Sequence, residues 1–184
     1  MVKTYSPVCD FGRAAPDFSL PGADGKTYAL RDCAGENATL VMFICNHCPF
    51  VQAILDKLVR DVGELAAFGV GAAAVMSNDP TDYPEDSFEN MARVSRARAF
   101  TFPYLFDETQ AVAKSYGAVA TPDFFGYDRE MKLQYRGRFD DGGMSDAPDA
   151  RRELYEAMRQ IAETGRGPEE QTPSVGCSIK WTRR

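Results

Sequence analysis

The residues best suited to chemistry are two cysteines separated by two residues, in the sequence Cys45-Asn46-His47-Cys48. The apolar, β-prone run from Thr39 to Ile44 predicts a buried strand just before them. An apolar stripe at helical spacing over residues 51–65 predicts a helix just after them. Pro49 fits the first turn of that helix, where its missing N–H has no helical partner. We therefore expect the cysteine pair at a strand–helix junction.

A dithiol in this setting is typical of thiol–disulfide exchange. The thiolate is the reactive form, and a helix N-terminus lowers the pKa of a nearby thiol to roughly 3.5–7.5. We expect Cys45, at the strand end where solvent reaches it, to attack a target disulfide. Cys48, shielded inside the first helical turn, would then resolve the mixed disulfide. The alternative is a pair of buried structural cysteines.

His47 is the single histidine of the chain and lies inside the motif. It could hydrogen-bond or charge-stabilise the Cys45 thiolate, or it could face solvent with no role. Cys45, His47 and Cys48 could also supply three metal ligands, but structural zinc requires four. Because the sequence has no second Cys or His cluster, we expect neither a metal nor a cofactor.

The composition of the chain limits the cellular compartments and the classes of partner that we expect. The chain has 184 residues and a formal net charge of −6, which disfavours nucleic acid as a partner. An apolar run long enough to span a bilayer is absent from the sequence, and residues 1–11 have no apolar stretch of signal-peptide length. Five cysteines, an odd number, do not resemble a secreted disulfide framework. We expect a cytoplasmic protein with no membrane partner.

Cys177 leaves two hypotheses open. Gly176 and Ser178 beside it suggest a flexible tail that could fold back and bring a third redox cysteine to the dithiol. Alternatively, Ile179 and Trp181 anchor the tail and the cysteine is inert, since free cysteines are often simply buried.

Strand and helix signals alternate along the chain, and together they predict an α/β protein with a central mixed sheet and helices on both faces. An added N-terminal β-hairpin would pair residues 17–20 with residues 27–30. The expected strands cover 39–44, 70–76, 104–106, 123–127 and 132–135, and the expected helices follow residue 48 and cover 87–99, 108–116 and 148–164. We expect residues 1–184 to form a single domain, with an irregular lead-in over 1–14 and a tail over 165–184.

Three segments in order resemble the thioredoxin-like superfamily, in its redoxin branch of AhpC/TSA and TlpA-like proteins. They are Ala15-Pro16-Asp17-Phe18-Ser19-Leu20 with Asp24-Gly25-Lys26, then Cys45-Asn46-His47-Cys48, then Ala120-Thr121-Pro122-Asp123. The resemblance is greatest to bacterial peroxiredoxin-like thioredoxin-family proteins, whose ending the segment 173–181 also resembles. It implies a thioredoxin fold, a cis peptide bond at Thr121–Pro122, and substrate binding by Thr121, Pro122 and Asn46.

The sequence also departs from this family's patterns. Peroxiredoxins carry Pro-x-x-x-Thr-x-x-Cys before the reactive cysteine, and neither Cys45 nor Cys48 has that pattern before it. Thioredoxin has Trp before its first cysteine and a buried Asp six residues before it, where this chain has Ile44 and Thr39.

The leading hypothesis is therefore a thiol–disulfide oxidoreductase, acting on a disulfide-bearing protein or small thiol substrate and regenerated by a cellular thiol reductant. A thiol peroxidase, whose reactive cysteine aligns with Cys48, is the first alternative. A non-enzymatic binding or metal-handling module is the second, although copper-handling relatives need a distal histidine that this chain lacks. The oligomeric state is left open.

Overall fold

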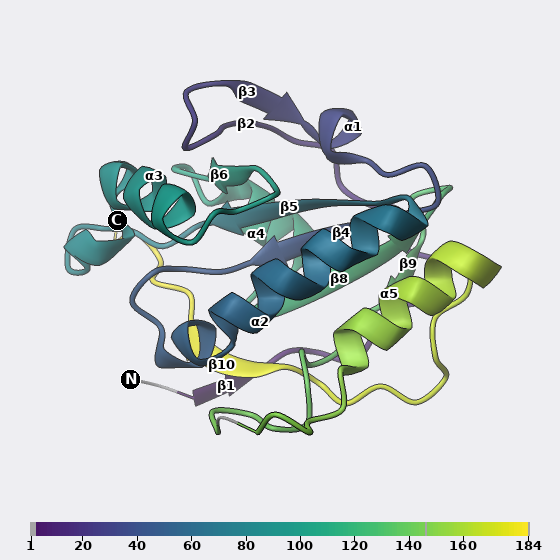
Figure 1. Ribbon diagram of the computed structural model, residues 1–184. Coiled ribbons are helices and arrows are strands. Elements are labelled where there is room, and N and C mark those ends of the chain that lie inside the picture. The colour runs from purple at the N-terminus through teal and green to yellow at the C-terminus, as the bar shows by residue number, and fades with distance from the viewer. Residues whose placement is uncertain (1–2, 146, 184) are drawn as a thin grey trace.

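A computed structural model describes residues 3–145 and 147–183 of the protein. Its main sheet has five strands in the order β6-β5-β4-β8-β9 (Figure 1). The bounds are β4 Ala38–Phe43, β5 Val70–Met76, β6 Tyr104–Phe106, β8 Asp123–Asp128 and β9 Leu133–Tyr135. Strands β4, β5 and β6 are parallel, whereas β8 and β9 are antiparallel to their neighbours. The predicted mixed sheet is confirmed.

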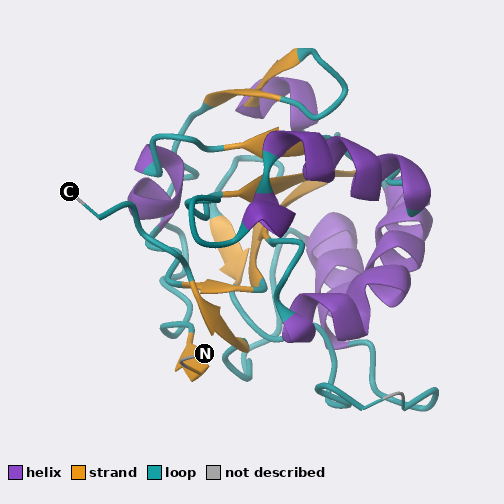
Figure 2. Cartoon of the chain, turned by 90° about the vertical axis from the view of Figure 1, so that its left-hand side faces the viewer, coloured by secondary structure: helices purple, strands orange, loops and turns teal. Residues whose placement is uncertain are grey.

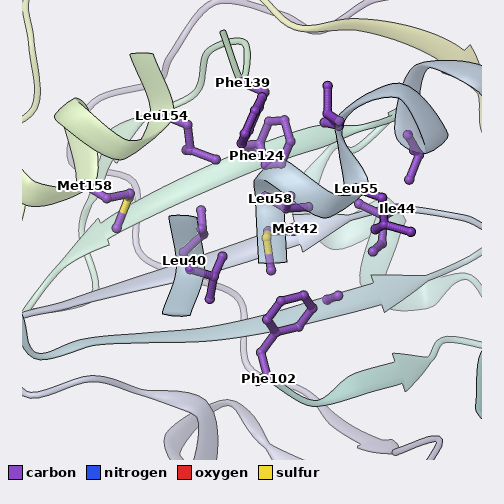
Figure 3. Close-up of a cluster of buried hydrophobic side chains, with 14 of the residues drawn as sticks. Leu40, Met42, Ile44, Leu55, Leu58, Phe102, Phe124, Phe139, Leu154 and Met158 are labelled. Carbon is purple, nitrogen blue, oxygen red and sulfur yellow. The ribbon is translucent and has the colours of Figure 1, made fainter. Parts of the chain in front are cut away.

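Helices cover both faces of this sheet, and the alternation along β4 shows why. Leu40 and Met42 point into a core made with α2 and α5, while Val41 and Phe43 point into a second core on the other face. Figure 3 shows the first core, with Leu58 of α2 and Met158 of α5 beside β4. The helices have the bounds α1 Leu30–Cys33, α2 Pro49–Leu65, α3 Phe88–Ala97, α4 Ala111–Tyr116 and α5 Glu153–Thr164.

The second core lies under α1, α4 and a two-stranded hairpin. The hairpin pairs β2, Ser19–Pro21, with β3, Thr27–Ala29, so the hairpin prediction is confirmed. Figure 2 shows the strands running between a group of helices on one side and a short helix on the other. Among the described helices, none is both long and apolar enough to cross a membrane.

Within the expected tail over 165–184, residues 175–178 form a strand that the sequence did not predict. β10, Val175–Ser178, lies between β1, Lys3–Tyr5, and β7, Ala120–Thr121, in a three-stranded antiparallel sheet. Ile179 is buried just beyond it. The same pairing shows that the expected lead-in over 1–14 contains a strand, and Met1, Val2 and Arg184 lie outside the described residues. Pairing between segments so far apart leaves no local signal in the sequence.

Two helix starts also differ from the predictions. The helix expected from residue 108 begins at Ala111, because a turn closed by the Gln110 N–H on the Asp107 carbonyl precedes it. At the start of this helix, the Asp107 carboxylate accepts the amides of Val112 and Ala113. The helix expected from residue 148 begins at Glu153.

Candidate active site

The dithiol lies where the structure changes from strand β4 to helix α2, as predicted. Cys45 lies two residues beyond β4, and Cys48 is the residue that caps the N-terminus of α2, with Pro49 at its first position. Both cysteines are buried, with exposed fractions of 1% and 0%. The expectation that solvent reaches Cys45 is therefore wrong in this conformation, and that of a shielded Cys48 is confirmed.

Thr121 touches both cysteines from β7. Its hydroxyl oxygen Oγ1 lies 3.2 Å from Cys45 Sγ, and its carbonyl oxygen lies 3.2 Å from Cys48 Sγ. The Thr121–Pro122 peptide bond is cis, as the family resemblance implied. Thr121, a predicted substrate-binding residue, therefore lies at the dithiol, and Pro122 follows it in the chain; their contact with substrate stays a prediction.

The negative charge of the dithiol is favoured on Cys48 rather than on Cys45. The pKa of Cys48 is held well below its ordinary value by a hydrogen bond from Cys45 and, against the opposing effect of burial, by further bonds from Cys177 and the Val51 amide. The pKa of Cys45 is raised by sharing its proton with Cys48, by burial, and by the charge of Asp86. We expected the lowered pKa at Cys45. The helix begins one step later than that expectation assumed, and the Val51 amide of its first turn bonds to Cys48.

His47 interacts more closely with Asp86 than with Cys45, the residue that it was expected to hydrogen-bond. Its Nδ1 lies 2.6 Å from Oδ2 of Asp86 but 3.9 Å from Cys45 Sγ. Its ring also stacks on that of Tyr83 with centroids 4.3 Å apart, so a hydrogen bond and a stacking contact both hold the ring. The solvent-facing alternative is wrong, because 9% of the His47 side chain is exposed.

Asp86 organises the loop that carries the motif. It is fully buried, and its carboxylate accepts hydrogen bonds from the Asn46 and His47 amides, from His47 Nδ1 and from Asn78 Nδ2. Burial alone would raise the pKa of Asp86, but the bonds from His47 and Asn78 outweigh it and hold the pKa below its ordinary value. Asp86 is therefore a carboxylate that fixes the backbone between the two cysteines.

Asn46 serves this same loop. Its Nδ2 donates to the Glu85 carbonyl and its Oδ1 accepts from the Tyr104 hydroxyl, so both ends of the side chain are engaged within the protein. The hydrogen bonds thus give Asn46 an anchoring use, and its predicted contact with substrate finds no support in them.

The structure brings together a set of possible metal ligands that differs from the set Cys45, His47 and Cys48 suggested by the sequence. Cys45, His47 and Asp86 have their ligand atoms within 4.8 Å of one another, so Asp86 takes the place that Cys48 was considered for. Three ligands fall short of the four that structural zinc requires, and the Asp86 carboxylate already accepts four hydrogen bonds.

Two residues of this site escaped the prediction from sequence. Sequence patterns do not indicate Asp86, and they do not decide between the two hypotheses for Cys177. Asp86 could have been found, because it lies in the segment after β5, and the carboxyl ends of the parallel strands β4 and β5 meet at one edge of the sheet.

Comparison with known proteins agrees with this architecture. The AhpC/TSA family model matches residues 11–136. The crystal structure of an uncharacterized conserved protein from Geobacillus kaustophilus is 44% identical, with a TM-score of 0.94 over 100% of this chain and 98% of that chain. Peroxiredoxin Bcp from Escherichia coli is 25% identical over 126 residues, 67% of this chain and 76% of that protein.

The fold and the dithiol together define a thioredoxin-fold protein. A thiol:disulfide interchange protein from Chlorobium tepidum shares this fold at 15% identity, with a TM-score of 0.63 over 82% of this chain and 97% of that chain. The chain belongs to the AhpC/TSA family, in the redoxin branch of the thioredoxin superfamily. This membership indicates an oxidoreductase with thiol redox chemistry.

Proposed function

We propose that the protein is a thiol–disulfide oxidoreductase that cycles Cys45 and Cys48 between a dithiol and an internal disulfide. The observation that carries this proposal is the position of the cysteine pair between β4 and α2, with Cys48 at the N-terminus of the helix and Thr121 in contact with both sulfurs. In this setting a hydrogen bond from Cys45 lowers the pKa of Cys48 and favours its thiolate. A structural cysteine pair has no need of a thiolate, whereas nucleophilic attack on a disulfide requires one.

The roles of the two cysteines follow from where the charge lies. The Cys48 thiolate attacks one sulfur of the substrate disulfide, forming a mixed disulfide and expelling the other substrate sulfur as a thiolate. Cys45 gives its proton to that leaving thiolate and then attacks Cys48 Sγ. The Cys45–Cys48 disulfide forms, and the second substrate sulfur leaves as a thiolate. These roles reverse those expected from the sequence, since the lowered pKa is that of Cys48.

The burial of both sulfurs bears on the substrate. Both sulfurs are buried, with exposed fractions of 1% and 0%, so the segment around them must open before a substrate can reach them. A small disulfide needs a smaller opening than a folded protein does. Of the two substrate classes expected, we therefore favour a small disulfide. A cellular thiol reductant would reduce the Cys45–Cys48 disulfide and complete the cycle.

A thiol peroxidase is the second candidate, because the favoured thiolate occupies the peroxidatic position, Cys48. The Cys48 thiolate would attack the distal oxygen of a hydroperoxide, forming a sulfenic acid and expelling an alkoxide or hydroxide, which takes the Cys45 proton and leaves as an alcohol or water. Cys45 would then condense with the sulfenic acid, giving the same disulfide and a hydroxide.

Turnover of two substrates separates these candidates. With dithiothreitol as reductant and its uncatalysed reaction subtracted, we expect oxidised glutathione to be reduced faster than hydrogen peroxide is consumed. Cys48→Ser should abolish the reaction, and Cys9→Ser, which changes a cysteine outside the site, should leave it unchanged. Faster consumption of hydrogen peroxide would favour the peroxidase. Activity that survives Cys48→Ser would refute both candidates.

A further inference from the structure

A third cysteine contacts the dithiol, and the proposed cycle does not use it. Cys177 Sγ lies 2.7 Å from Cys48 Sγ, and both residues are buried, with exposed fractions of 1% and 0%. Cys48 therefore has a sulfur neighbour on two sides, since its other neighbour is the thiol of Cys45.

The backbone holds Cys177 in this position. β10 pairs with β7 so that Cys177 lies opposite Thr121, the residue that touches both cysteines of the dithiol. A Cβ on Gly176 would collide with the Thr121 carbonyl, so glycine allows β10 to approach this closely. The contact between Cys177 and Cys48 thus arises from strand pairing rather than from the folding back of a loose tail.

We propose that Cys177 is a second resolving cysteine, which attacks Cys48 Sγ after oxidation and forms a Cys48–Cys177 disulfide. The proposal rests on the proposed function, because it needs Cys48 to become oxidised by an incoming disulfide.

The exchange is balanced without a further oxidant. Starting from the Cys45–Cys48 disulfide, the Cys177 thiolate attacks Cys48 Sγ, the Cys48–Cys177 bond forms, and the Cys45–Cys48 bond breaks. Cys45 leaves as a thiolate and takes up the proton that Cys177 released. Starting from a mixed disulfide on Cys48, the leaving group is the substrate thiolate instead.

The surroundings of Cys177 make this attack conditional on the oxidation of Cys48. Burial, the hydrogen bond to Cys48 and the charge on Cys48 together raise the pKa of Cys177 to about 12, against the opposing charge of Lys180. A disulfide at Cys48 removes both of that residue's contributions, while Lys180 continues to favour a thiolate. Cys177 is therefore inert beside the reduced dithiol and becomes more reactive once Cys48 is oxidised.

Disulfide mapping of the Cys45→Ser protein tests this inference. Oxidised glutathione is added, the remaining thiols are blocked, and the protein is digested with trypsin. We expect two of the four remaining thiols to be lost, and peptide 32–57 to become linked to peptide 167–180. Fragmentation between Cys33 and Cys48 locates the link. The same link should appear as a second product in the wild-type protein, which needs no substitution and so guards against a misfolded variant.

Two controls separate the possible failures. Adding Cys177→Ser to Cys45→Ser should leave only a glutathione adduct on Cys48, whereas adding Cys9→Ser should preserve the link. If Cys45→Ser itself yields only the glutathione adduct, while the wild-type protein forms the Cys45–Cys48 disulfide, the inference is overturned and the proposed function stands. A wild-type protein that loses no thiols would overturn both.

Discussion

Removing the charge of Asp86 should destabilise the protein and disturb the dithiol at the same time. In Asp86→Asn, one side-chain oxygen can still accept the two backbone amides of Asn46 and His47. The new NH₂ group would replace the oxygen that accepts from His47 Nδ1 and Asn78 Nδ2. His47 could adapt by changing tautomer, but Asn78 is fixed, because its own Oδ1 accepts the Lys180 amide.

The size of the effect follows from this count. At least one buried donor loses its acceptor, which costs about 1–3 kcal/mol, and a charge-assisted bond worth about 1.5–3 kcal/mol is weakened. We expect the free energy of unfolding to fall by about 2–4 kcal/mol in Asp86→Asn, because part of the network adapts. Glu85→Gln, at the exposed neighbouring carboxylate, is the matched control and should change it by less than about 0.5 kcal/mol.

Urea unfolding under reducing conditions measures this difference, and its pH dependence has a defined sign. The folded pKa of Asp86 is below the unfolded value of about 3.9, so its stabilisation is fully present above that value. This stabilisation is lost as pH falls through the folded pKa. The difference in free energy of unfolding between the wild-type and Asp86→Asn proteins should therefore become smaller at that pH. An Asp86→Asn protein as stable as Glu85→Gln at neutral pH would refute this account of the loop.

Three further predictions concern the sulfurs themselves. Cys45→Ser should raise the pH at which the Cys48 thiolate forms, because Cys45 is the main hydrogen-bond donor to that sulfur. Ultraviolet absorbance of the thiolate should show this shift, and the control variant Cys33→Ser should show none. Asp86→Asn should lower the pKa of Cys45, since the carboxylate raises it, and an unchanged second titration step would contradict this. Thr121→Val should raise the pKa of Cys45 and slow reduction of oxidised glutathione, whereas Thr121→Ser, which keeps the hydroxyl, should retain the wild-type rate.

The parts of the site that could be predicted have local signals. A β-prone run, a C-x-x-C motif, a proline and a helical stripe follow one another without interruption, so the position of the dithiol required no long-range information. The cis bond at Pro122 followed from the family resemblance in the same local way.

The parts that could not be predicted depend on contacts between distant segments. Cys177 reaches Cys48 because β10 pairs with β7, more than 50 residues earlier in the chain. Helix α2 starts after Cys48, and Asp86, from a distant segment, holds the Asn46 and His47 amides outside it. The sequence pattern places the helix near the motif but does not decide which cysteine caps it.

The most direct test of the central claim is a redox equilibrium of the wild-type protein in glutathione buffers, read by thiol blocking and peptide mapping. The account predicts that two of the five thiols disappear together, with the dependence of a two-electron couple. It also predicts that Cys48 is one of the pair in every oxidised molecule, with Cys45 as a partner. Pairs that lack Cys48, or an oxidised form confined to Cys9 and Cys33, would contradict it.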